Sequence, residues 1–279
     1  MCLPRAAWAL IRASHPIPTA AVTILTVALG VALDVPATLL VTLGVAVLSG
    51  QLSVGWLNDY VDRHRDRATS RTDKPLAVGA VSSARVRWAT VTAAAVCAPA
   101  SLALGLAAGT VHLVAVGAAW AYNLGVKKTV WSWLPYAIGF GLLPVIAWLV
   151  SPQSGLPPWW LIAGAALLGV GAHGANVLPD LEDDRSTGVA GLPHRLPPGV
   201  LRGATAGVLL GALVLLTVGS AAGLTIVDVA ALSAGTVLAA VAAGACDSRL
   251  PARAPLLAAA AIAALAIATL LAGTPTGLP

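Results

Sequence analysis

Apolar runs of 18 to 22 residues recur along the chain, and they constrain its fold more than any other feature of the sequence. Each run is long enough to cross the hydrocarbon core of a bilayer, which is about 30 Å thick. A backbone inside that core must satisfy its own hydrogen bonds, so the runs predict helices. We expect nine membrane-spanning helices, at residues 16–34, 37–57, 86–106, 109–126, 133–151, 159–178, 203–220, 223–244 and 254–272.

The whole chain, residues 1–279, is therefore expected to form a single all-α membrane domain. Apolar residues make up 58% of it, above the roughly 45–50% of a soluble domain. The first run is not taken as a signal peptide, because eight further runs follow it and no small-residue cleavage site stands out behind it.

Basic residues predict the orientation in the membrane. With nine spans, all 16 Lys and Arg residues fall on one side, in or at the edge of alternate segments. These inner segments are 1–15, 58–85, 127–132, 179–202 and 245–253. Positive residues gather on the cytoplasmic side, so the N-terminus and these segments are expected there. The net charge of +5 then reflects contact with anionic membrane lipid, and nothing in it calls for a nucleic acid partner.

Two acidic clusters follow the second and the sixth predicted spans, in the two longest inner segments. Both have the spacing Asn-x3-Asp-x3-Asp, which places three side chains on one helix face. Pro179 is expected to kink the sixth predicted helix or to begin a new one with Asp180 near its start. The clusters consist of Asn58, Asp62 and Asp66, and of Asn176, Asp180 and Asp184.

Carboxylates one helical turn apart repel each other, and they are costly near a membrane core. A divalent cation offsets both effects. Mg2+ prefers oxygen ligands and is often held by one or two carboxylates together with substrate phosphates. The paired clusters therefore predict a site in which two helices hold Mg2+ against a diphosphate.

At these residues the chain resembles a known family. NDYVDRHRD at 58–66, followed by RTDKPLAVGAVS at 71–82, resembles the first signature of the UbiA superfamily of intramembrane prenyltransferases. NVLPDLEDDRSTGVAGLPHRL at 176–196 resembles the second. The resemblance covers essentially the whole chain. It implies a ring of nine helices around a central apolar cavity, capped by inner loops 58–85 and 179–202.

The resemblance also implies roles for single residues. The expected metal ligands are Asn58, Asp62, Asp66, Asp180 and Asp184, and the four aspartates among them are the expected catalytic residues. The expected diphosphate-binding residues are Asn58, Arg71, Lys74, Tyr122, Lys127 and Asn176. Some aromatic prenyltransferases of the family carry an acid where Asn176 stands, which argues against a simple 4-hydroxybenzoate-type acceptor.

The expected function is Mg2+-dependent transfer of a prenyl group from an allylic prenyl diphosphate to a small lipophilic acceptor, either aromatic or a quinone precursor. A terpene cyclase of the same superfamily is an alternative, since it would use the same diphosphate site. A membrane transporter is a second alternative, although its ionisable groups would favour the bilayer midplane. A CDP-alcohol phosphotransferase lacks support because the chain has no DGxxAR element.

The remaining polar candidates are weaker. His173 precedes Asn176 by one turn and is expected to be either a hydrogen-bonded packing residue or a contact of the acceptor. His15, His64 and His194 have no Cys or His partner at zinc spacing, and they are expected at the surface or in loops. Arginines outnumber lysines 13 to 3, which suggests a GC-rich bacterial source. The expected location is the cell membrane, with a multi-pass chain and a site open to the cytoplasm.

Overall fold

The computed structural model of the protein describes residues 5–69, 71–219, 224–244 and 254–273. Within these ranges every regular element is an α-helix or a short 3-10 helix. The predicted inner segment 245–253, with Arg249 and Arg253, lies outside the described residues. Residues 1–4, in the first inner segment, also lie outside the described residues. So do residues 220–223, where the predicted runs 203–220 and 223–244 adjoin.

Within the described residues, a helix of 16 or more residues covers most of each predicted apolar run. These helices are α2 (Pro16–Ala32), α3 (Ala37–Ala68), α4 (Ser83–Leu102), α5 (Leu106–Leu124), α6 (Leu134–Leu149), α7 (Trp159–Val177), α9 (Pro198–Val218), α10 (Ile226–Gly244) and α11 (Ala254–Gly273). Shorter elements lie between them: α1 (Arg5–Ala13), η1 (Val126–Lys128), η2 (Leu178–Asp180), α8 (Leu181–Ser186) and η3 (Leu192–Arg195).

Three helical stretches of the described residues are long and apolar enough to cross a membrane. They are α3, residues 159–186 from α7 to α8, and α9. Helices α1 and α2 make a fourth if this pair, bent by 63°, counts as one span. In α6, α10 and α11 the apolar stretches are shorter. The fold is thus that of a helical membrane protein, and the count of nine spans stays a prediction.

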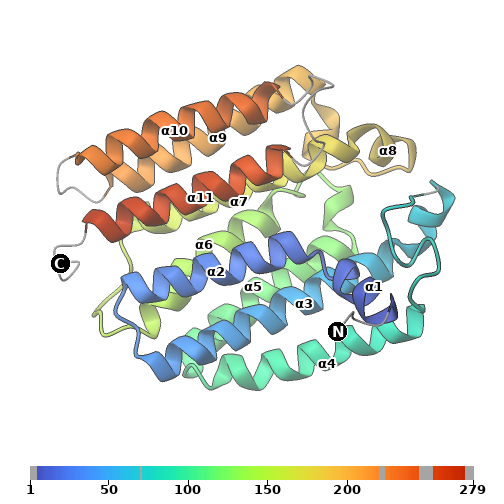
Figure 1. Cartoon of the computed structure of the whole chain (residues 1–279), viewed down its shortest axis with the longest axis horizontal. Helices are drawn as coiled ribbons and strands as arrows, with labels where there is room; N and C mark the ends of the chain where they lie inside the picture. The colour runs from blue at the N-terminus through green and yellow to red at the C-terminus, as the bar shows by residue number, and fades with distance from the viewer. Residues whose placement is uncertain (1–4, 70, 220–223, 245–253, 274–279) are drawn as a thin grey trace.

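Each long helix packs against the next one along the chain, with α9 following α7. The last helix, α11, also contacts α2 and α7, and α2 contacts α6 (Figure 1). The first and last long helices are therefore in contact. Closure into a ring around a central apolar cavity stays a prediction.

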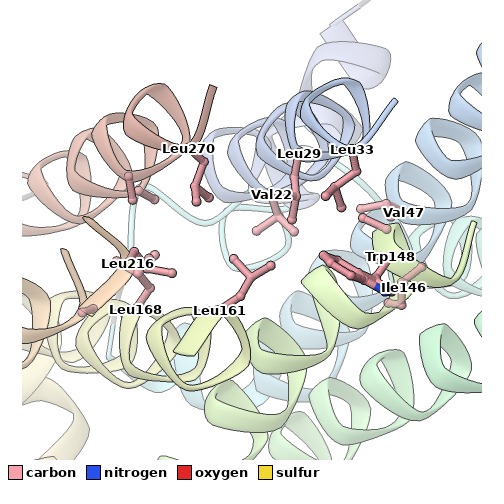
Figure 2. Close-up of a cluster of buried hydrophobic side chains, with 14 of the residues drawn as sticks. Val22, Leu29, Leu33, Val47, Ile146, Trp148, Leu161, Leu168, Leu216 and Leu270 are labelled. Atoms are coloured by element: carbon pink, nitrogen blue, oxygen red, sulfur yellow. The ribbon is translucent and has the colours of Figure 1, made fainter. Parts of the chain in front are cut away.

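The largest buried cluster joins α2, α3, α6, α7, α9 and α11, and Figure 2 shows apolar side chains from these helices facing one another. The labelled residues are Val22, Leu29, Leu33, Val47, Ile146, Trp148, Leu161, Leu168, Leu216 and Leu270. Lipid is as apolar as these side chains, so the cluster stabilises the helices through close van der Waals packing.

Glycine allows two close helix approaches. A Cβ at Gly55 in α3 would collide with the backbone of Ser14, which precedes α2. A Cβ at Gly169 in α7 would collide with the backbone of Tyr136 in α6. Small residues at such crossings let backbones come together, as is common among membrane helices. Both contacts fix the helices that carry the polar residues described below.

The two acidic clusters differ in local structure. Helix α3 runs for 32 residues without a break, so Asn58, Asp62 and Asp66 lie on one helix as expected. The second cluster is divided, because Pro179 lacks the backbone N–H that an α-helix requires. Helix α7 ends at Val177, Asp180 lies in η2, and α8 begins at Leu181. The sequence predicted this break, although it removes the continuous helix face proposed for the second cluster.

Candidate functional site

Helix α1, the segment after α3, and α8 lie at one end of the helices (Figure 1). Many polar residues of the predicted inner segments belong to these elements. This end includes the last two turns of α3 and the turn from α7 into α8. The connections on this side are those predicted to be the inner loops 58–85 and 179–202.

Arg65 links the two acidic clusters. One guanidinium nitrogen lies 3.1 Å from a carboxylate oxygen of Asp62 and 3.4 Å from one of Asp66, both on α3. The other terminal nitrogen lies 3.4 Å from Asp184 on α8. A guanidinium presents donors in a rigid fork, which lets one side chain contact several carboxylates. The structure therefore brings Asp62, Asp66 and Asp184 around a single cation.

Arg71 links the second acidic cluster to the segment after α3. It lies 3.1 Å from Asp180 and donates two hydrogen bonds to Asp73, of 2.8 and 2.9 Å. The hydrogen bonds from Arg71 lower the pKa of Asp73 to about 2. The segment after α3 is thus tied to η2, and Arg71 stands beside one of the predicted metal ligands.

Lys127 reaches the first cluster from η1. Its ammonium lies 2.5 Å from Asp62, and the lysine is only 5% exposed. Burial lowers the pKa of Lys127, while the charge of Asp62 opposes that shift. Asp62 therefore has two cationic partners, one on its own helix and one from the connection between α5 and α6.

Lys74 has a different partner from the other predicted diphosphate residues. It lies 2.8 Å from Asp59 and 3.2 Å from the ring nitrogen Nε2 of His15. His15 itself lies 3.1 Å from Asp59, whose carboxylate is buried. These three residues tie the start of α2, helix α3 and the segment after α3 together, next to the Asp62 cluster.

Asn58 and Tyr122 both make contacts near the end of α5. Asn58 donates a hydrogen bond of 3.0 Å to Asn123, which in turn donates to the backbone of α3 at Val54. The ring of Tyr122 meets Tyr136 edge-on at 5.2 Å and His173 at 5.6 Å between centroids.

His173 is a buried packing residue with one hydrogen bond, which is the first of the two roles expected for it. Its Nε2 lies 3.1 Å from the hydroxyl of Ser132, and its ring stacks on Tyr136 with centroids 4.7 Å apart. The ring nitrogen Nδ1 is buried and has no partner in the described part of the chain. Nothing in these contacts assigns His173 to an acceptor.

The second inner segment folds back onto its own acidic cluster. His194 lies in this segment, as expected, but its side chain is buried and lies 3.1 Å from Asp184. Arg185 donates to the backbone oxygens of His194 and Leu196, which holds the segment in place. Asn176 is exposed at the end of α7.

The structure therefore brings most of the predicted residues together, but in three groups. Asp62, Asp66 and Asp184 lie around Arg65, with Lys127 paired to Asp62; Asp180 lies against Arg71; and Lys74 lies against Asp59. Asn58, Tyr122 and Asn176 belong to none of the three.

Sequence reasoning missed four contributors: Arg65, His15, Asn123 and His194. The spacing from Asp62 to Arg65, three residues along a helix, predicts an ion pair between them. No pattern in the sequence predicts that the same guanidinium also reaches Asp184, because that contact crosses from α3 to α8.

The donor set fits a hard divalent cation. Carboxylate oxygens from two segments converge within the reach of one guanidinium, and Mg2+ prefers such oxygens. Within the described residues, however, no three His, Cys, Asp or Glu side chains already form a metal-binding group. The guanidinium of Arg65 lies among the carboxylates instead.

Two apolar surface grooves lie away from this polar end. The first has a volume of about 450 Å³ between α3 and α4, with Leu48, Trp56 and Val96 in its lining. The second has a volume of about 670 Å³ between α10 and α11. Neither is lined by the aspartates, so the expected apolar cavity next to them stays a prediction.

Solved structures of similar fold come from the same superfamily. A UbiA homolog from Archaeoglobus fulgidus bound to GPP and Mg2+ has a TM-score of 0.72 at 15% identity, covering 95% of this chain and 99% of that one. The apo structure of a UbiA homolog from Aeropyrum pernix K1 has a TM-score of 0.71 at 19% identity, covering 97% and 99%. The Archaeoglobus fulgidus homolog bound to DMAPP and Mg2+ has a TM-score of 0.71 at 16% identity, covering 96% and 99%.

At these identities the structural likeness establishes the fold. No curated protein sequence matches the chain significantly. The UbiA prenyltransferase family matches residues 16–257, which include both acidic clusters and both inner loops. That match covers most of the chain, and we conclude that the chain belongs to the UbiA prenyltransferase family.

Proposed function

We propose that the protein is a Mg2+-dependent prenyltransferase. It transfers a prenyl group from an allylic prenyl or polyprenyl diphosphate to a small lipophilic acceptor, either aromatic or a quinone precursor. One observation carries the proposal: the two acidic segments meet, with Arg65 in contact with Asp62 on one side and Asp184 on the other. Carboxylates from two helices that converge at one end of an apolar helical protein suit a metal-bound diphosphate.

The relatives support both the cofactor and the donor class. Homologs in the same fold are bound to GPP or DMAPP together with Mg2+. In this chain the proposed metal ligands are Asn58, Asp62, Asp66, Asp180 and Asp184, and the four aspartates are the proposed catalytic residues. Bound Mg2+ would shield the charge of the diphosphate and make it a better leaving group.

The cationic side chains around the carboxylates are suited to hold the diphosphate. Arg71 and Lys127 already lie against Asp180 and Asp62, so each can contact a phosphate oxygen that replaces the carboxylate as its partner. Lys74 is paired with Asp59, which is not one of the proposed metal ligands. The proposed diphosphate-binding residues are Asn58, Arg71, Lys74, Tyr122, Lys127 and Asn176.

The apolar helices serve the other half of the reaction. After the diphosphate leaves, the allylic cation must be protected from water until the acceptor captures it. We propose that the nine helices form a ring around an apolar cavity that holds the prenyl chain. Loops 58–85 and 179–202 would cap this cavity on the cytoplasmic face, in a multi-pass protein of a bacterial cell membrane.

Product analysis tests the proposal. Purified protein is incubated with geranyl, farnesyl or geranylgeranyl diphosphate, with and without Mg2+, and then with a lipid extract or candidate phenols and quinol precursors. A transferase releases pyrophosphate with Mg2+ only when an acceptor is present, and it yields a prenylated acceptor. Release without Mg2+, or no release with any donor and extract, contradicts the proposal.

The same assay separates the two alternatives. A terpene cyclase yields a hydrocarbon or terpene alcohol from the diphosphate alone, because the capturing double bond belongs to the substrate. A transporter releases no pyrophosphate under either condition.

A further inference from the structure

Arg65 stands out among the cations at the polar end. Among the described residues it is the one side chain that contacts carboxylates of both acidic clusters. It lies at the end of α3, and its side chain is 25% exposed. Lys127 contacts only the first cluster through Asp62, and His194 contacts only the second through Asp184. Arg65 therefore occupies the position where the two clusters meet.

The guanidinium and a metal ion cannot share this position. A Mg2+ ion needs its oxygen ligands at about 2.0–2.1 Å in near-octahedral geometry. Arg65 keeps the oxygens of Asp62, Asp66 and Asp184 at 3.1 to 3.4 Å from its own nitrogens. The lack of a ready-made metal-binding group among the described carboxylates agrees with that spacing. For one ion to bridge the two clusters, Arg65 has to leave.

We infer that Arg65 is a built-in counter-ion that competes with the divalent cation for Asp62, Asp66 and Asp184. The inference rests on the metal site of the proposed function. Without metal, Arg65 offsets the repulsion among the three carboxylates and holds α3 and α8 together. When the cation binds, the displaced guanidinium needs another anion, and a diphosphate at the same site provides one.

This exchange couples the two ligands. Metal alone displaces Arg65 from its three carboxylates, whereas metal with diphosphate also gives the displaced guanidinium a new ion pair. Each ligand should therefore raise the affinity for the other, by the same factor in both directions. Arg65 would make the site bind metal weakly until the substrate arrives.

The test compares Arg65→Gln with a matched control, Arg67→Gln. Both variants remove one positive charge from the end of α3. Arg67, however, is exposed, and its one side-chain hydrogen bond to a described residue goes to the backbone oxygen of Leu76. Mn2+ replaces Mg2+ as the probe, and its binding to the purified full-length protein is followed by electron paramagnetic resonance.

We expect Arg65→Gln to bind Mn2+ about tenfold more tightly than the unmodified protein, because a cation in contact with the carboxylates is removed. Arg67→Gln should stay within about threefold, since an exposed charge is screened. Adding geranyl thiodiphosphate, which ionises poorly, should raise Mn2+ affinity less in Arg65→Gln than in the unmodified protein.

Thermal unfolding gives a second readout that needs no turnover. In EDTA, Arg65→Gln should melt below the unmodified protein, because its three carboxylates have lost a shared counter-ion. Mn2+ should then raise its melting temperature by more than it raises that of the unmodified protein. Arg65→Lys keeps the charge but loses the fork that reaches both clusters, so its Mn2+ affinity should lie between those of the unmodified protein and Arg65→Gln. It also extends the test if the glutamine variant folds poorly.

Equal Mn2+ affinities in the unmodified protein and Arg65→Gln would overturn the inference. A weaker affinity in the variant would do so too, since it would show that Arg65 supports the metal site. Asp184→Asn, which removes a proposed metal ligand, is the control for the site itself. If Asp184→Asn does not weaken Mn2+ binding in the unmodified protein or in any of the variants, the metal site is wrong, and the proposed function fails together with the inference.

Discussion

Asp184 and Asp183 are adjacent in α8, yet their surroundings differ completely. Asp184 is in contact with Arg65 and His194, whereas Asp183 is exposed. Replacing each aspartate by asparagine keeps its shape and removes its charge. The pair therefore separates the effect of a lost metal ligand from that of a lost surface charge.

We expect Asp184→Asn to lower the turnover of prenyl diphosphate by about 100-fold or more, equivalent to roughly 2.7 kcal/mol of transition-state stabilisation. Asp183→Asn should stay within a few-fold of the unmodified protein. The measurement is pyrophosphate release at saturating Mg2+, with both variants shown to be folded by their melting curves. Similar losses in the two variants would mean that net charge, rather than ligation, explains the effect.

Lys74 and Asp59 form the most buried part of the ion-pair cluster that includes His15. The side chains are 14% and 2% exposed, and their charged atoms lie 2.8 Å apart. Removing one partner leaves the other as an incompletely paired charge away from water. Removing both avoids that cost, because no uncompensated ion is left behind.

We expect Lys74→Met to destabilise the protein by about 3 kcal/mol, since Asp59 keeps only His15 as a partner. The double variant Lys74→Met with Asp59→Asn should recover part of that loss. A double-mutant cycle on melting temperatures in detergent measures the coupling between the two residues. Additive losses would show that the pair contributes nothing beyond its two separate residues.

At the scale of helices, hydrophobicity and proline predicted most of what the structure shows. Within the described residues, most of each apolar run lies in a helix, because a spanning helix satisfies its own backbone hydrogen bonds. Pro179 marked the break before Asp180 for the same physical reason, a missing donor. Helix crossings were not predictable, since they depend on which glycine faces which neighbouring backbone. Gly169 against Tyr136 is the clearest case.

Gly169 and Gly207 offer a matched pair of helical glycines. A Cβ at Gly169 would meet the backbone of Tyr136, which cannot rotate away as a side chain can. A Cβ at Gly207 in α9 would meet nothing within 4 Å. Gly169→Ala should therefore cost about 1–3 kcal/mol of stability through overpacking, whereas Gly207→Ala should be neutral or stabilising.

The comparison of melting temperatures for the two alanine variants checks this prediction. Gly169→Ala should also reduce turnover, because Tyr136 stacks on His173 and meets Tyr122 near the carboxylates. Equal melting temperatures would mean that α6 and α7 separate easily at this crossing.

At the scale of the whole molecule, the candidate site was predictable only in part. The spacing of the aspartates predicts metal ligands, and the structure brings Asp62, Asp66 and Asp184 of this pattern around Arg65. The ion pairs of Arg65 with Asp184 and of Lys127 with Asp62 were not predictable. They depend on how α3, η1 and α8 pack against one another, and they join residues far apart in the sequence. Charge near a membrane has to be paired, but sequence does not say with what.

The distribution of basic residues makes one prediction about the whole molecule, its orientation in the membrane. Ser154, between α6 and α7, and Ser186, at the end of α8, are both exposed. They belong to opposite faces if residues 159–178 span the bilayer. Every Lys and Arg lies in or beside one of the five predicted inner segments, and Ser186 belongs to one of these, 179–202. Positive residues favour the cytoplasmic side.

Single cysteines at the two positions test that orientation in intact cells, in a background where the native Cys2, Cys97 and Cys246 are replaced. A membrane-impermeant maleimide should label Ser154→Cys from outside and leave Ser186→Cys unlabelled until the cells are opened. Labelling at Ser186→Cys from outside would place the carboxylates of α8 on the external face. The diphosphate site would then face away from the cytoplasm, and the predicted orientation would be wrong.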